Sequence, residues 1–201
     1  MTWEIPRLLK SAWMRAIVDI ERATYRSAYE RLDRAYRLRD PWHLSGAHEQ
    51  ARFAALDAYV QEHCPEVKSI LEIGAGEGHH TVHLTAIVDD VVGVEVSGRA
   101  IRRARRRCPR ATFVQAAFPD MPASVARRFD LVIAAEVLYY VADVPRAIAA
   151  MTSRGRACIA TYYAREIERL DPYLSHVPGL RMDETRIGDA RHRICLWRGE
   201  C

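Results

Sequence analysis

The feature that most constrains this 201-residue chain is the segment SILEIGAGEGHHT, residues 69–81. An apolar run leads into a turn that holds Gly74, Gly76 and Gly78, and a segment of helical pattern leaves it. Glycine lets a backbone adopt left-handed conformations and approach a ligand closely. Strand, glycine-rich turn and helix in that order are typical of an α/β domain with a ligand at the carboxyl end of its strands.

Strands and helices alternate along the rest of the chain. Apolar runs predict strands over 69–74, 90–97, 111–118, 129–138 and 156–164, and helical patterns predict helices over 7–37, 47–63, 79–87, 97–108 and 143–152. Ser97 and Asp143 are expected to cap two of these helices. The tail, 179–188 and 191–199, predicts a hairpin at the sheet edge. We therefore expect an α/β fold with a doubly wound, mostly parallel seven-stranded sheet, an antiparallel C-terminal hairpin and an N-terminal helical extension.

The length fits one domain, residues 1–201, better than two. Within it, we expect residues 1–66 to form a helical or lid extension and residues 67–201 to form the sheet core that binds a cofactor. No apolar run approaches the roughly 20 residues that cross a bilayer. Charged residues at positions 4, 10, 15 and 19 interrupt any signal peptide. We expect a cytoplasmic protein without a membrane partner, as a monomer or a homodimer.

The densest patch of positive charge is the stretch RRARRRCPR, Arg102 to Arg110, while the net charge is only +4. An arginine cluster attracts nucleic-acid phosphates, but it is also what a solvated helix face looks like. Because no aromatic residues interleave the run, the solvated face is favoured and nucleic acid is not expected as a partner. Five cysteines without a C-x-x-C pair, and two adjacent histidines, His79 and His80, that point apart on a helix, predict no metal site.

Three ligands compete for the glycine turn. A P-loop requires a lysine after the turn, and none follows. A dinucleotide turn requires G-x-G-x-x-G, and His79 stands where the third glycine of that pattern should be. The third glycine of this turn is Gly78, so the turn reads G-x-G-x-G. Glu95, at the end of the next strand, suits ribose hydroxyls in NAD and in S-adenosylmethionine alike. Glu72 discriminates, because a carboxylate beneath the turn repels a pyrophosphate and tolerates a cationic ligand.

These motifs resemble the class I S-adenosylmethionine-dependent methyltransferases. LEIGAGEG is similar to their first motif, VVGVEVS to their acidic second strand, and FDLVIAAEVLYYVAD to their fourth-strand motif. The combination of DPW, HEQARFAAL and AEVLYYV resembles, more narrowly, the NodS-like nodulation methyltransferases, which N-methylate the deacetylated sugar of a chitooligosaccharide. The resemblance covers about Arg39 to Tyr162 and implies a Rossmann-like methyltransferase fold with S-adenosylmethionine as cofactor.

The resemblance also implies roles for single residues. The backbone of the turn would approach the methionyl part of the cofactor, Glu72 would hold its ammonium group directly or through water, and Glu95 would bind the ribose. The cofactor-binding residues implied in this way are Glu72, Gly74, Ala75, Gly76, Glu95, Val96, Ala117, Phe118 and Trp42. Ala117 departs from the family pattern, which often has an aspartate there, so the adenine amino group would be left to backbone groups or to Asp120. TSRGRACIA also departs, because a Pro-Gly-Gly turn is usual before the fifth strand.

The methyl acceptor is expected at the end of the fourth strand. Glu136 could orient a protonated amine or accept its proton, or it could merely cap a turn. Tyr139 and Tyr140 follow directly, and each could line the site or pack in the core. Trp42 could cover the site as part of a lid or could anchor its segment to the core.

The function that we predict is methyl transfer from S-adenosylmethionine to a small molecule, with an amino group of a sugar-like acceptor as the first choice. O-methylation of a hydroxylated natural product is an alternative. A cofactor-binding module without catalysis and an RNA-binding or RNA-modifying protein that uses Arg102 to Arg110 are alternatives of other classes. An NAD-dependent oxidoreductase is the most distant one.

Overall fold

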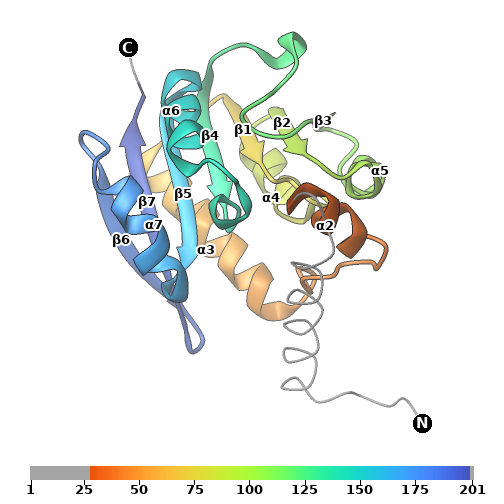
Figure 1. Cartoon of the computed structure of the whole chain (residues 1–201), viewed down its shortest axis with the longest axis horizontal. Helices are drawn as coiled ribbons and strands as arrows, with labels where there is room; N and C mark the ends of the chain where they lie inside the picture. The colour runs from red at the N-terminus through yellow and green to blue at the C-terminus, as the bar shows by residue number, and fades with distance from the viewer. Residues whose placement is uncertain (1–27, 200–201) are drawn as a thin grey trace.

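The computed structural model of the chain describes residues 28–199. Most of the helix predicted over 7–37 lies outside these residues, and its last part is α2, Ala28–Ala35. Figure 1 shows one sheet flanked by helices, with α2 beside the ends of the central strands. Among the described residues, no helix is both long enough and apolar enough to cross a membrane.

One seven-stranded sheet forms the centre of the molecule, in the order β3-β2-β1-β4-β5-β7-β6. Its first five strands pair in parallel, whereas β7 runs antiparallel to both β5 and β6. The strands are β1 Ser69–Ile73, β2 Asp90–Glu95, β3 Thr112–Gln115, β4 Phe129–Ala135, β5 Gly155–Tyr163, β6 Arg181–Ile187 and β7 Ala190–Arg198. The predicted sheet and its C-terminal hairpin are confirmed. The strand order reverses between β1 and β4, which is where ligands bind in such sheets.

Helices cover both faces of this sheet. On one face, α3 (Ala47–His63) and α4 (His79–Ile87) pack on β1 and β4, and α5 (Gly98–Arg107) packs beside them on β2 and β3. On the other face lie α6 (Val144–Arg154) and α7 (Ile167–Leu174). Side chains alternate between the faces along β1: Leu71 and Ile73 pack toward α6 and α7, and Ile70 toward α3 and α4. Glu72 therefore points toward the same face as Ile70, beneath α4.

The local signals for the helix boundaries are confirmed. Ser97 accepts a hydrogen bond from the backbone N–H of Ala100 at 3.2 Å, and Asp143 accepts one from Arg146 at 3.0 Å. The helix α7 was not predicted, because Pro172 lies inside it and proline removes a helical hydrogen bond. Complete burial of Leu170 and Leu174 in the core offsets that loss.

Candidate active site

The glycine turn connects β1 to α4 at the carboxyl edge of the sheet. Gly74, Gly76 and Gly78 have φ angles of 72°, 54° and 77°, in the left-handed region that favours glycine. A Cβ atom on Gly74 would come within 2.4 Å of a methyl carbon of Val137, and one on Gly76 within 2.8 Å of the hydroxyl of Tyr36. These positions therefore require glycine both for the backbone conformation and for space.

Glu95 ties the turn to the end of β2. Its buried carboxylate accepts hydrogen bonds from the backbone N–H of Gly76 at 3.0 Å and of Ser97 at 2.9 Å. Burial raises the pKa of Glu95, and these backbone hydrogen bonds oppose that rise. A carboxylate offers about four acceptor positions. The acceptor positions that the protein leaves open suit hydroxyl groups, which is what a ribose presents.

An apolar cavity of about 40 Å³ lies between α2 and the ends of β1, β2 and β4. Of the predicted cofactor-binding residues, Gly74, Glu95, Val96 and Phe118 line it, as does Tyr140 from the predicted acceptor side. The sequence analysis missed the other lining residues, which are Tyr29, Leu32, Ile73, Val94, Ala116, Val137 and Val141.

These residues fit the cofactor that the sequence predicts. Val96 and Phe118 offer apolar walls to an adenine, and the Glu95 carboxylate suits a ribose. The volume left beneath α2 is far below the roughly 300 Å³ of small-ligand pockets. Access for a nucleoside therefore requires Tyr29 and Leu32 on α2 to move outward.

Ala117, Asp120 and Glu72 lie outside the lining of this cavity. Ala117 forms an isolated antiparallel bridge with Asp120, and the Asp120 carboxylate accepts two hydrogen bonds from Arg146, at 2.6 and 3.1 Å. Glu72 is buried beneath α4, where it accepts a hydrogen bond from the hydroxyl of Thr81 at 2.5 Å. Its second oxygen lies 3.4 Å from Nδ1 of His80. The predicted contact of Glu72 with the cofactor ammonium stays a prediction.

Glu136 follows β4 directly and has a φ of 57°, which is uncommon outside glycine. Its carboxylate oxygens lie near four donors: the backbone N–H of Tyr163 at 3.0 Å, Nδ1 of His192 at 3.1 Å, the hydroxyl of Tyr139 at 3.3 Å and that of Thr161 at 3.4 Å. Residues held in sparsely populated backbone conformations cluster at functional sites. The next residue, Val137, packs against Gly74 in the glycine turn, whereas the Glu136 carboxylate contacts β5 and β7.

His192, on β7, is the main residue that the sequence analysis missed. It is 1% exposed, and its Nε2 atom has no hydrogen-bond partner among the described residues. A carboxylate only accepts hydrogen bonds, so Nδ1 of His192 carries a proton and donates a hydrogen bond to Glu136. The position was not recognisable from sequence, because pairing of β7 with β5 brings His192 opposite Tyr163.

Two further sets of hydrogen bonds lie on the predicted acceptor side of the site. Tyr163 donates a hydrogen bond from its hydroxyl to Glu49 on α3 at 2.9 Å, and Glu49 pairs with Arg52 at 2.8 Å. Trp42 donates from its indole nitrogen to the hydroxyl of Tyr140 at 3.2 Å. Burial raises the pKa of Tyr139 and Tyr140, so both phenols stay neutral. Trp42 thus links the segment after α2 to the predicted acceptor side.

Comparisons with known proteins identify the family of this chain. The family model of nodulation protein S (NodS) matches residues 24–154. Nodulation protein S of Bradyrhizobium diazoefficiens is 32% identical over 170 residues, which is 83% of this chain and 70% of that protein. The match spans between 30% and 54% of the length of four other curated relatives. One of these is the dTDP-3-amino-3,4,6-trideoxy-alpha-D-glucopyranose N,N-dimethyltransferase of Streptomyces venezuelae, 34% identical over 74 residues, 37% of this chain and 30% of that protein.

A solved structure shares the fold. The N-methyltransferase NodS from Bradyrhizobium japonicum WM9, in complex with S-adenosyl-L-homocysteine, superimposes with a TM-score of 0.71 at 23% identity, over 87% of this chain and all of that one. The sheet of this chain thus has the fold of a methyltransferase. The chain belongs to the nodulation protein S family of S-adenosylmethionine-dependent methyltransferases.

Proposed function

We propose that this chain transfers a methyl group to the amino nitrogen of a small, sugar-like acceptor. The observation that carries the proposal is the Glu136–His192 pair, which follows the carboxyl end of β4 and keeps an imidazole nitrogen without a hydrogen-bond partner among the described residues. S-adenosylmethionine supplies an electrophilic methyl group. The chain must hold the acceptor in line with that methyl and accept one proton per transfer.

Each residue has a defined part in this proposal. Glu95 binds the ribose hydroxyls, and the backbone of Gly74 and Gly76 approaches the cofactor. Glu136 positions His192, and Nε2 of His192 accepts the proton that the acceptor nitrogen loses. Tyr139 and Tyr140 line the acceptor side, where their neutral hydroxyl groups donate hydrogen bonds.

An imidazole held by a carboxylate would serve a hydroxyl acceptor as well as an amine. Support for an amine comes from the relatives: the Streptomyces venezuelae protein and that of Streptomyces fradiae are both named as N,N-dimethyltransferases of dTDP-amino sugars. An amine with a depressed pKa needs little base, whereas a hydroxyl needs its proton removed during transfer.

The experiment is methyl transfer from isotope-labelled S-adenosylmethionine to glucosamine oligomers, followed by mass spectrometry. N-acetylated oligomers are the matched control, because they keep every hydroxyl and lack the nucleophilic amine. We expect label in the free-amine oligomers alone. Equal labelling of both oligomers would point to O-methylation, and labelling of neither would remove amino sugars from the proposal.

A further inference from the structure

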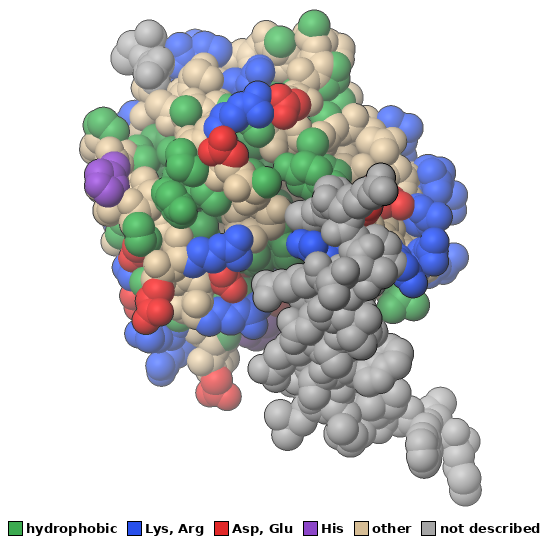
Figure 2. All heavy atoms as spheres, viewed as in Figure 1, with side chains coloured by type: hydrophobic (Ala, Val, Ile, Leu, Met, Phe, Trp, Pro, Cys, Tyr) green, Lys and Arg blue, Asp and Glu red, His purple; other side chains and the backbone are tan. Residues whose placement is uncertain are grey.

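A second concave site lies outside the active site, between α5 and the segment that follows α2. It is a pocket of about 650 Å³. Figure 2 shows lysine and arginine side chains gathered at the edge of the molecule where α5 lies in Figure 1. Seven arginines and two carboxylates line this arginine pocket, together with Ser45 and His79; the arginines are Arg37, Arg39, Arg99, Arg102, Arg103, Arg106 and Arg107.

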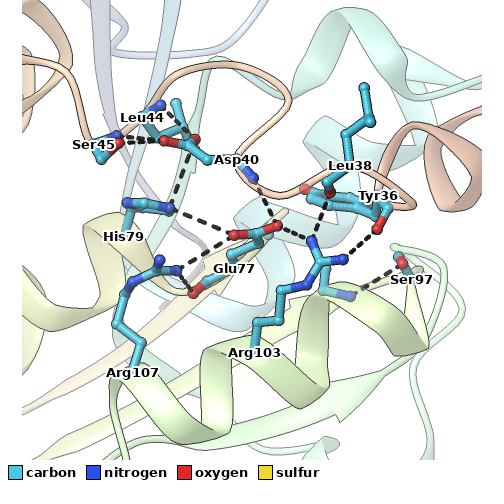
Figure 3. A network of polar contacts seen from close by, with 12 residues as sticks. Tyr36, Leu38, Asp40, Leu44, Ser45, Glu77, His79, Ser97, Arg103 and Arg107 are labelled. Atoms are coloured by element: carbon cyan, nitrogen blue, oxygen red, sulfur yellow. Dashed lines mark hydrogen bonds and ion pairs between the residues drawn. The ribbon is translucent and has the colours of Figure 1, made fainter. Parts of the chain in front are cut away.

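The two carboxylates of the pocket are already satisfied by the protein (Figure 3). Glu77 is buried and pairs with Arg103 and, at 3.7 Å, with Arg107, while it also accepts the backbone N–H of Asp40 at 3.1 Å. Asp40 accepts hydrogen bonds from Leu44 at 2.6 Å and from Ser45 at 2.9 and 2.5 Å. They therefore do not neutralise the outer arginines.

The side chains of four of the arginines have no hydrogen-bond or ion-pair partner among residues 28–199. Arg37 and Arg39 lie on the segment after α2, and Arg102 and Arg106 lie one turn apart on α5. Like charges at this helical spacing destabilise a helix by a few tenths of a kcal/mol. An arrangement that places exposed cations on both sides of a pocket, at a cost in stability, suits a ligand with several negative charges.

The base of the pocket holds an unpartnered polar atom. His79 is 7% exposed, and its Nε2 atom lies 3.7 Å from Asp40 and 3.8 Å from Glu77, beyond hydrogen-bond distance of either. Burial and the charge of Arg107 lower the pKa of His79, which keeps the ring neutral. Buried polar atoms in folded proteins nearly always have a partner, so this nitrogen calls for a ligand atom or a bound water.

We propose that the arginine pocket binds the phosphates of a small oligophosphate, such as pyrophosphate or a nucleoside diphosphate. Planar guanidinium groups match phosphate oxygens in pairs. The volume exceeds what one phosphate needs, and no Phe, Tyr or Trp lines the pocket for a base to stack on. A bound oligophosphate bridges Arg37 and Arg39 to Arg102 and Arg106.

That bridge also acts on the active site. The segment after α2 already rests on Arg103, which donates hydrogen bonds to the carbonyls of Tyr36 at 2.6 Å and Leu38 at 2.7 Å. Tyr36 in turn lies against Gly76. An anion in the pocket therefore slows opening of the segment that covers the glycine turn.

The test is calorimetric titration of the full chain with inorganic pyrophosphate at low and at physiological salt. We expect saturable binding that the double variant Arg102→Gln/Arg106→Gln weakens by more than about tenfold, because two charge-assisted contacts are lost. Arg154→Gln/Arg198→Gln is the matched control: it removes the same charge outside the pocket, and its affinity should stay within about twofold of the wild type. Melting temperatures of both variants check their folding.

Three results would overturn the proposal. They are absence of pyrophosphate binding, equal weakening in the two double variants, and tighter binding of a single-stranded RNA oligomer than of pyrophosphate at the same site. Amide hydrogen exchange supplies a readout without variants: pyrophosphate should protect residues 36–45 and α5, and leave β6 unchanged. Neither experiment depends on methyl transfer, so failure here leaves the proposed activity standing.

Discussion

The two edges of the active site are built in different ways. The cofactor edge consists of a short turn between neighbouring elements and one acid, Glu95, at the end of the next strand. The acceptor edge gathers Glu49, Glu136, Tyr163 and His192 from α3, the end of β4, β5 and β7. The first edge presents mainly backbone groups and the second presents side chains. A site made of backbone groups suits a constant ligand such as a cofactor, because substitutions change it little. A site made of side chains can change its ligand through single substitutions.

Of the substitutions that separate the two edges, removal of the acid at the cofactor edge should have the largest effect, and it should act on cofactor affinity. Glu95→Ala takes away the acceptor of the Gly76 and Ser97 amides. It also takes away the acceptor that we propose for two ribose hydroxyls. Hydrogen bonds to charged groups contribute about 1.5–3 kcal/mol each, so binding of S-adenosylhomocysteine should weaken by more than about 100-fold. Calorimetry measures this, with Glu95→Gln as a milder control. An affinity within threefold of the wild type would remove Glu95 from the ribose role.

Substitutions at the acceptor edge should lower turnover rather than cofactor affinity. Glu136→Gln keeps the shape of the side chain but weakens its hold on His192, so kcat should fall by about 100-fold, in the usual range for general acid–base groups. Cofactor affinity should change by less than threefold. His192→Gln should flatten the pH dependence of kcat as well as lower it, a change that a purely structural residue would not cause. If either variant also lost cofactor affinity, the division of the site into a cofactor edge and an acceptor edge would be contradicted.

A substitution in the glycine turn should have an intermediate effect, on stability. This effect can be separated into the cost of the backbone conformation and the cost of a steric contact. Gly74→Ala meets both a φ of 72° and a side-chain atom at 2.4 Å, whereas Gly179→Ala meets a φ of 66° and no atom within 4 Å. A left-handed conformation costs about 1–2 kcal/mol, so Gly179→Ala should destabilise by that amount and Gly74→Ala by more. Chemical denaturation compares them. The double variant Gly74→Ala/Val137→Ala should recover the excess; if it does not, the contact is not the cause.

The smallest effect concerns Asp40, which holds the segment between α2 and α3. Burial raises the pKa of this carboxyl, but hydrogen bonds from Ser45 and Leu44 outweigh burial and the pKa is lowered. A lowered folded-state pKa stabilises the protein above the ordinary value near 4, and the contribution is lost as the pH falls further. The stability difference between the wild type and Asp40→Asn should therefore shrink between about pH 5 and pH 3. A difference independent of pH would contradict this.

The sequence indicated the glycine turn more fully than the contacts around Glu136, for a physical reason. The turn is contiguous, its glycines report local backbone conformation, and Glu95 follows a recognisable strand, so short-range patterns suffice. Glu136 was predicted because it ends such a strand. His192 lies in a strand whose pairing partner is 29 positions away, Tyr163, and whose antiparallel register no local pattern fixes. The same holds for α2: its sequence indicates a helix, but not that Tyr29 and Leu32 face the cavity.

The most direct test of this division is a crystal structure of the chain with S-adenosylhomocysteine and a glucosamine oligomer. We expect the Glu95 carboxylate to lie within hydrogen-bond distance of both ribose hydroxyls, with α2 displaced outward from its present place. We also expect the acceptor nitrogen to lie near Nε2 of His192. A ribose that lies away from Glu95, or an amine held far from the Glu136–His192 pair, would contradict these expectations.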